Sequence, residues 1–284
     1  MISVHVDMRR TLRLIGKALL ATSIAMALTV GGDFSMEARQ AVYGKRQIQF
    51  YAPYAGAAPV YLPPVLLVAH NAGNQPETAR RALNHQAAGM EIDVRYVNGV
   101  LYATHSEPSS YMPLMAWQAP RLRDAWTYSS GATVLKLDLK STGDRALAQL
   151  VRFIGARPTD QQLIMVSNDQ NALILLDATL PNTLQLLSIS NGDEVDELLM
   201  NNGGVDGVEG ISIPAWVLTA ERVLALKERG YVIDAWTVND VDQLVQLATM
   251  GVDSVTTDNL AFFDMAFAVT YEPESDVAQL PADV

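Results

Sequence analysis

The sequence contains no cysteine, which excludes disulfide bonds, thiolate metal ligands and cysteine nucleophiles. Any metal ion must therefore be held by oxygen or imidazole ligands. Basic residues are scarce as well, because 20 lysines and arginines stand against 31 aspartates and glutamates, for a formal net charge of −11. Such a field repels the phosphate backbone of nucleic acids and anionic membrane surfaces, so nucleic acid is not expected as a partner.

Charged residues of both signs are few, at 18% of the 284 residues, whereas hydrophobic residues make up 49%. This composition supports a buried core and excludes global disorder. The length is enough for one large domain of roughly 200–250 residues with tails at its ends.

The N-terminal region lacks an apolar run long enough to be a standard membrane-spanning helix. Its uncharged run, residues 18–32, is about 15 residues long, and a spanning helix needs roughly 20. A small-x-small cleavage pattern, Ala25-Met26-Ala27, lies inside the run, and four basic residues precede it: Arg9, Arg10, Arg13 and Lys17. We therefore expect residues 1–32 to be a signal peptide or a membrane anchor. The protein would then be exported, and membrane association would arise through this segment.

The rest of the chain divides into three parts. Residues 33–64 form a lead-in segment with four prolines and one expected strand at 46–51. Residues 65–270 carry a regular alternation of elements, and residues 271–284 form an acidic tail.

The alternation in the middle part predicts an α/β fold. Short apolar, β-rich runs are expected as strands at 65–69, 90–95, 134–140, 163–166, 184–188, 207–213, 232–237 and 254–257. Amphipathic runs between them are expected as helices at 77–88, 114–126, 144–154, 171–179, 193–201, 220–229, 241–250 and 260–268. Eight strand–helix units predict a (β/α)₈ TIM barrel, and a doubly wound open sheet is the alternative, because both bury the sheet on two faces.

Capping residues support several of these helices. Thr219 and Gly230 are expected to cap the helix at 220–229, and Asn239 and Gly251 the helix at 241–250. Asp258 and its neighbour are expected to cap the last helix.

Charged residues alternate with apolar ones along the second expected strand. Glu91, Asp93 and Arg95 share one face, because side chains of a strand point alternately to its two sides. Two carboxylates on an inner face are costly unless a cation balances them. A divalent metal with hard oxygen ligands would do so, and an ion-pair network with Arg95 and Lys136 is the alternative.

The third expected strand repeats this pattern. Lys136, Asp138 and Lys140 share one face, and leucines fill the other. Asp138 is a candidate third metal ligand, and a lysine beside it is suited to hold an anionic oxygen. Three carboxylates with two cations describe a site for a charged substrate such as a phosphate ester.

Two histidines and one tryptophan follow or end expected strands. His70 ends the first strand, and the turn dipeptide Asn98-Gly99 predicts a hairpin that brings His105 back over the barrel mouth. Two histidines with a metal suit acid–base or nucleophilic cleavage of a phosphodiester. Trp236 is expected either at the mouth, against an apolar part of the substrate, or in the core.

Taken in order, these residues resemble the glycerophosphodiester phosphodiesterase family. The family pattern is His-Arg-Gly, a Pro-Glu-Asn-Thr-like helix start, Glu-x-Asp, His-Asp and Glu-x-Lys. The corresponding segments here are His70-Asn71-Ala72-Gly73, Gln75-Pro76-Glu77-Thr78, Glu91-Ile92-Asp93, Thr104-His105-Ser106 and Asp138-Leu139-Lys140, followed by 236–239 and 251–258.

The resemblance implies a metal-dependent phosphodiesterase of lipid and glycerol metabolism. Its substrate would be a glycerophosphodiester or a lysophospholipid head group, and no obligate protein partner is implied. The implied roles are Mg²⁺ or Ca²⁺ binding by Glu91, Asp93 and Asp138, acid–base or nucleophilic catalysis by His70 and His105, and substrate contact by Lys140, Asn71 and Trp236.

The chain departs from the family pattern at three of these positions. Asn71 replaces an arginine, Ser106 an aspartate and Asp138 a glutamate. The short stretch from His105 to Asp138 leaves little room for the family's inserted cap, and Asp-Leu-Lys is similar to the third strand of sphingomyelinase D/phospholipase D toxins. Alternatives are therefore a sphingomyelinase D-like phospholipase, a catalytically silent barrel that binds a phosphorylated ligand, and a purely structural salt-bridge network.

Overall fold

The computed structural model describes residues 65–108, 118–200 and 207–267. The expected targeting segment, the strand expected at 46–51 and the acidic tail lie outside these ranges, as does the beginning of the helix expected at 114–126. Within the ranges, no helix combines the length and the apolar character that crossing a membrane requires.

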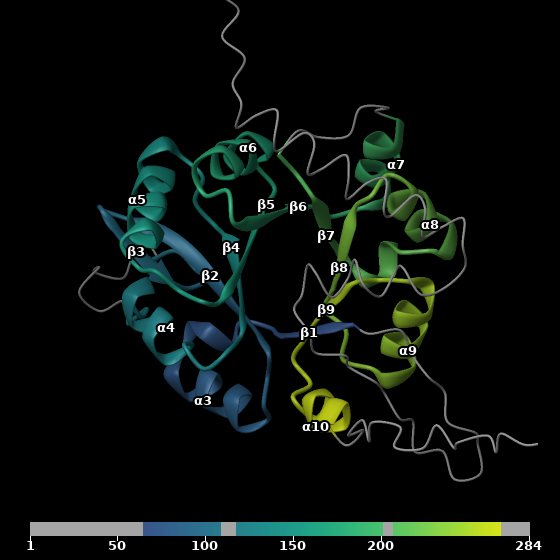
Figure 1. Cartoon of the computed structure of the whole chain (residues 1–284), viewed down its shortest axis with the longest axis horizontal. Helices are drawn as coiled ribbons and strands as arrows, with labels where there is room; N and C mark the ends of the chain where they lie inside the picture. The colour runs from purple at the N-terminus through teal and green to yellow at the C-terminus, as the bar shows by residue number, and fades with distance from the viewer. Residues whose placement is uncertain (1–64, 109–117, 201–206, 268–284) are drawn as a thin grey trace, which may run out of the picture.

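The strands form one nine-stranded sheet, of which eight parallel strands close into a barrel (Figure 1). β1 pairs in parallel with both β9 and β2, so the ring has no open edge, and β3 lies outside it, antiparallel to β2. The strands are β1 Leu66–Ala69, β2 Gly89–Val97, β3 Val100–Ala103, β4 Val134–Leu139, β5 Gln162–Ser167, β6 Thr183–Ser188, β7 Gly210–Pro214, β8 Val232–Trp236 and β9 Ser254–Thr257. The predicted (β/α)₈ barrel is confirmed, and the open sheet is excluded.

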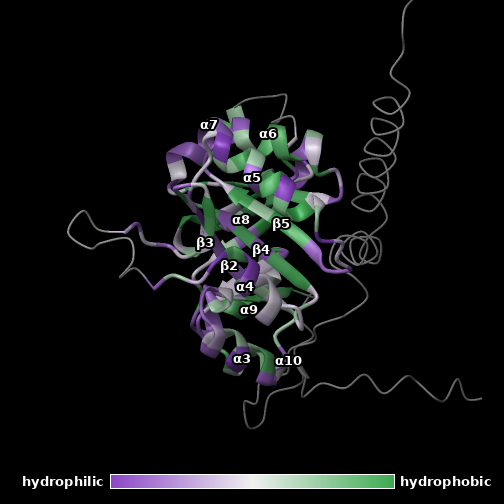
Figure 2. Ribbon diagram, turned by 90° about the vertical axis from the view of Figure 1, so that its left-hand side faces the viewer, coloured by the Kyte–Doolittle hydropathy of each residue, from purple (hydrophilic) through white to green (hydrophobic). Residues whose placement is uncertain are grey.

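Helices surround the barrel (Figure 1). The α-helices are α3 Pro76–Asn84, α4 Leu122–Tyr128, α5 Asp144–Gly155, α6 Gln170–Thr179, α7 Gly192–Met200, α8 Ala220–Glu228, α9 Val241–Met250 and α10 Ala261–Phe267, with short 3₁₀ turns η1 Ala72–Asn74 and η3 Ala215–Val217. His85, which caps α3, lies 2.8 Å from Asp264 of α10, so the first and last helices of the ring are joined. Figure 2 shows hydrophobic residues along β5 and hydrophilic residues on α3 and α7.

Two helices and one strand differ from the prediction by three or more residues at one end, and the other predicted elements of the barrel differ by at most two. α3 ends at Asn84 rather than at 88, because Gln86 takes a left-handed φ of 59° that turns the chain toward β2. α4 begins at Leu122 rather than at 114, since Arg121 before it is extended. β7 begins at Gly210, three residues later than expected.

The predicted caps are correct at one helix and partly wrong at the next. Thr219 accepts a hydrogen bond from the backbone of Arg222 at the start of α8. At α9 the N-cap is Asp240, not Asn239, because the Asp240 side chain accepts from the backbone of Gln243. Gly251 ends α9 with a φ of 98°, as the prediction required.

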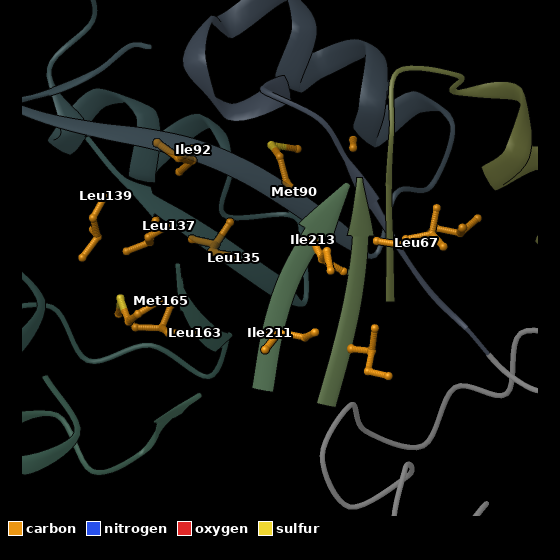
Figure 3. Packing of buried hydrophobic residues seen from close by; sticks show 14 of the residues in the cluster. Leu67, Met90, Ile92, Leu135, Leu137, Leu139, Leu163, Met165, Ile211 and Ile213 are labelled. Atoms are coloured by element: carbon orange, nitrogen blue, oxygen red, sulfur yellow. The ribbon is translucent and has the colours of Figure 1, made fainter. Parts of the chain in front are cut away.

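The hydrophobic core lies mainly between the barrel and the helices. Residues that face outward along the strands make up this layer, among them Leu67, Met90, Ile92, Leu135, Leu137, Met165, Ile211 and Ile213 (Figure 3). A smaller apolar cluster fills one end of the barrel interior: Leu66, Val68, Val134, Ile164, Val166 and Leu186. The period-two alternation of the strands therefore separates two apolar layers, one outside the sheet and one inside it.

Above the inner apolar cluster, the barrel contains a buried polar layer centred on Lys136 of β4. Its ammonium donates to Asp234 Oδ2 at 2.7 Å and to Thr256 Oγ1 at 2.9 Å, and lies 3.1 Å from Glu91 Oε1. Asp234 also accepts hydrogen bonds from Ser212 and Ser254, each at 2.7 Å. Side chains of five strands thus satisfy one another by hydrogen bonds and ion pairs.

Charge pairing keeps this layer ionised. Burial works against the charged form of Lys136, but the neighbouring Asp234 and Glu91 outweigh it and raise its pKa. Burial likewise opposes the charge on Asp234, and Lys136 with the hydroxyl donors lowers its pKa. Removing one partner would therefore leave an unpaired charge inside the barrel.

We predict that Lys136→Met lowers the free energy of unfolding by about 3–5 kcal/mol, because Asp234 and Glu91 lose their buried cation. In the double variant Lys136→Met/Asp234→Asn, the free energy of unfolding should fall by less than the sum of the decreases in the two single variants, since no charge at 234 then remains unpaired. Urea unfolding of the four proteins measures this coupling. Strict additivity would contradict the ion pair.

The close approach of β7 to its neighbours yields a second prediction. A Cβ on Gly210 would lie 2.2 Å from the backbone oxygen of Val232 and 2.7 Å from Leu186 Cδ2. Gly210→Ala should therefore lower the free energy of unfolding by about 1–3 kcal/mol. Gly155→Ala is the matched control, since nothing lies within 4 Å of its Cβ position, and it should be neutral or stabilising. Thermal unfolding of both variants checks the difference, and equal effects would rule out the steric argument.

Candidate active site

A pocket of about 410 Å³ lies at the carboxyl ends of the barrel strands. It is lined by seven of the eight residues that the sequence singled out: His70, Glu91, Asp93, His105, Asp138, Lys140 and Trp236. The topology brings them together because the carboxyl ends of parallel barrel strands meet on one face. Asn71, the eighth, is not among the described residues that line the pocket.

The two carboxylates of β2 are buried and held by the segment that follows β1. Asn74 Nδ2 donates to Asp93 Oδ2 at 2.6 Å, and the backbone N–H of Asp93 donates back to Asn74 Oδ1 at 2.9 Å. The backbone N–H of Asn71 donates to Glu91 Oε2 at 3.1 Å, in a left-handed conformation with φ 52°. Both carboxylates are thus fixed in position before any ligand binds.

The carboxylates of the pocket are paired with lysines. Lys140 Nζ lies 2.7 Å from Asp138 Oδ2 and 3.1 Å from Asp93 Oδ1, and Glu91 is paired with Lys136. Burial works against the charge on Lys140, but Asp138 and Asp93 outweigh it and raise its pKa. Among the residues that the structure describes, no three His, Asp or Glu side chains are arranged as a metal-binding group.

His70 belongs to a hydrogen-bonded chain that the sequence did not predict. Its Nδ1 lies 2.7 Å from Asp258 Oδ1, and Asp258 Oδ2 accepts from Asn239 Nδ2 at 3.0 Å. Burial opposes the charge on Asp258, but the hydrogen bonds from Asn239 and His70 outweigh it and lower its pKa. An ionised carboxylate only accepts, so Nδ1 of His70 carries a proton.

The other ring nitrogen of His70, Nε2, faces Asn71 and Glu91. His70 Nε2 lies 3.0 Å from Asn71 Nδ2 and 3.7 Å from Glu91 Oε2. Asn71 therefore contacts the histidine, and the direct substrate contact that the resemblance implies for it stays a prediction.

Asp258 was expected only as a cap for the last helix. Asn259, not Asp258, accepts from the backbone N–H of Ala261. The period-two rule, applied to β9, would have placed Asp258 on the inner face with Thr256. Pairing of β9 with β1 then brings it to His70.

The predicted hairpin is confirmed as β2 and β3, and it carries His105 to the pocket. Its turn residues Asn98 and Gly99 have positive φ angles of 47° and 86°. Arg95 Nη2 donates to the backbone oxygen of His105 at 2.7 Å, while the histidine itself is exposed. The imidazole is therefore accessible to a ligand and is held through its backbone.

Trp236 lies at the mouth rather than in the core. It is half-buried and lines both the pocket and a neighbouring cavity of about 530 Å³. Asn168 and Ser188 line both as well, and the second cavity also contains Glu194 and Glu197.

Part of the chain matches a known protein family. Residues 128–261 match the model of the Glycerophosphoryl diester phosphodiesterase family. The matched part includes Asp138, Lys140 and Trp236 and does not reach His70 or Glu91. No curated protein matches the chain.

Solved structures share the barrel. A phosphodiesterase from Oleispira antarctica, in complex with the product sn-glycerol-3-phosphate, is 21% identical with a TM-score of 0.60, over 73% of this chain and 98% of that one. A glycerophosphodiester phosphodiesterase from Parabacteroides distasonis is 18% identical with a TM-score of 0.58, over 72% and 97%. One from Thermotoga maritima is 19% identical with a TM-score of 0.55, over 70% and 96%.

These likenesses to solved structures concern the fold, and the family model adds the sequence of the second half of the barrel. Together they confirm the resemblance to the glycerophosphodiester phosphodiesterase family and support a phosphodiesterase activity for the chain.

Proposed function

We propose that the protein hydrolyses glycerophosphodiesters or the head groups of lysophospholipids with the help of a divalent cation. The observation that carries the proposal is that two histidines, three carboxylates and Lys140 line one pocket. The complex of the Oleispira antarctica phosphodiesterase with sn-glycerol-3-phosphate supports this class of substrate. Export through residues 1–32 is part of the same proposal.

The chemistry of the carboxylates fits a divalent cation. Asp93 and Asp138 already share one cationic group, because the ammonium of Lys140 contacts both. Glu91, Asp93 and Asp138 supply the hard oxygen ligands that Mg²⁺ and Ca²⁺ prefer, and these residues would hold the ion. A bound ion would neutralise negative charge on the phosphodiester.

The hydrogen bonds of His70 suit it to the first chemical step. Asp258 holds the proton at Nδ1, so Nε2 is the ring atom that would accept a proton from water or attack phosphorus once its contact with Asn71 gives way. Asn71 Nδ2 limits the rotation of the ring by its contact with Nε2. Asp258 also stabilises the positive charge that His70 gains in either case.

His105 is suited to the complementary role. It lies at the end of the hairpin, and its side chain is exposed to the pocket. An imidazolium there can donate a proton to the leaving alcohol. Lys140 would hold an anionic phosphate oxygen once it is released from the carboxylates.

We expect His70→Ala and His105→Ala each to lower kcat roughly 10²–10⁴-fold, because each removes a proton-transfer group. His85→Ala is the matched control, since His85 pairs with Asp264 away from the pocket. Hydrolysis of glycerophosphocholine by protein without residues 1–32 measures the effect. Full activity in either pocket variant would reject the mechanism.

Removing divalent ions should abolish hydrolysis, and adding Mg²⁺ or Ca²⁺ should restore it. Asp138→Asn should raise the metal concentration needed for half-maximal activity, because one ligand charge is lost. An EDTA titration followed by metal add-back measures this, and metal analysis of the purified protein checks for a bound ion. Turnover that survives exhaustive chelation would contradict the metal part of the proposal.

A second candidate function is favoured by the pairing of Lys140 with Asp93 and Asp138. In that case the ammonium stays between the carboxylates, and the barrel binds a phosphorylated ligand without cleaving it. Calorimetry with glycerophosphocholine, run beside a turnover assay, separates the two. Binding without product would favour the silent barrel, and product formation would exclude it.

A further inference from the structure

The cations that line the pocket differ in how far their hydrogen-bonding capacity is already used. In the described part of the chain these cations are Arg95, Lys136 and Lys140. Lys136 is 2% exposed and contacts Asp234, Glu91 and Thr256. Lys140 is held between two carboxylates. Neither ammonium can meet a new anion without leaving buried partners.

Arg95 is different, because its guanidinium is largely buried while its ionic partner is not. The Arg95 side chain is 12% exposed, and Nη1 lies 2.6 Å from Oε1 of Glu107, which is 75% exposed. An ion pair with so exposed a carboxylate is screened by water and salt and contributes little. Arg95 Nε is buried and has no hydrogen-bond partner among the described residues.

A buried N–H without a partner is rare and costly, so it indicates a missing acceptor. A phosphodiester carries anionic oxygens, and the planar guanidinium presents pairs of N–H groups that match two such oxygens. The position of Arg95 suits this role, since it is on the inner face of β2, two residues beyond Asp93.

We propose that Arg95 binds the phosphate of the substrate and that Glu107 competes with the phosphate for it. The inference rests on the proposed function and names the residue that recognises the anion. Through Nη2, Arg95 also holds the backbone oxygen of His105. The same side chain therefore positions the phosphate relative to the second histidine.

Binding of inorganic phosphate and of sn-glycerol-3-phosphate tests the proposal directly, by calorimetry on the wild type and four variants. Arg95→Gln should weaken binding roughly 10- to 100-fold, because a charge-assisted hydrogen-bonded contact is lost. The phosphate affinity of Arg95→Lys should lie between those of the wild type and Arg95→Gln, since lysine keeps the charge and loses the paired donors. Arg123→Gln, the matched control at a side chain that is 60% exposed, should leave binding unchanged.

The direction in which Glu107→Gln changes phosphate affinity decides between competition and a structural role. If Glu107 competes with phosphate, its neutral variant should bind phosphate more tightly than the wild type. If the Arg95–Glu107 pair is only structural, both variants should weaken binding alike. Thermal unfolding of each variant accompanies the titrations, and Arg95→Lys supplies the test if Arg95→Gln fails to fold.

Unchanged phosphate affinity in Arg95→Gln, weaker binding in Glu107→Gln, or a wild type that binds neither ligand would overturn the proposal. Turnover assays separate this inference from the proposed function. Hydrolysis of glycerophosphocholine with an unchanged KM in Arg95→Gln would reject Arg95 and keep the enzyme. Arg95-dependent phosphate binding without any hydrolysis would keep Arg95 and reject the enzyme.

Discussion

The whole site depends on the balance of charge inside the barrel. Glu91, Asp93 and Asp234 are almost completely buried, and carboxylates at such positions are stable only beside cations or many donors. Lys136 supplies the charge for Asp234 and Glu91, and Lys140 supplies it for Asp93 and Asp138. The two lysines thus allow an acidic, reactive surface at the end of a barrel whose other end is apolar.

The apolar and charged side chains inside the barrel form successive layers along the strands. The apolar inner cluster lies at one level, the Lys136–Asp234 network at the next, and the pocket with both histidines at the carboxyl ends. The side chains of the middle layer make hydrogen bonds with one another and lie beneath the pocket. The pocket layer contains the exposed His105, and Arg95 Nε in this layer is buried without a hydrogen-bond partner among the residues that the structure describes.

Much of this arrangement follows from period-two patterns in the sequence. The alternation Glu91-Ile92-Asp93 and Lys136-Leu137-Asp138 predicted which side chains face inward, and the strands place them there. The turn at Asn98-Gly99 predicted the hairpin that carries His105. Helix ends were less predictable, as at α3, because the backbone conformation of one residue, Gln86, ended the helix before its amphipathic pattern did.

The sequence by itself determined the alternation of strands and helices, the inward face of each charged strand and the kinds of side chain available for catalysis. Only the tertiary structure decided the partners. The contacts of His70 with Asp258 and of Lys136 with Asp234 join residues far apart in the chain, and each depends on which strands close the barrel. Local patterns fix the direction of a side chain, whereas the group that it meets depends on strand order and register.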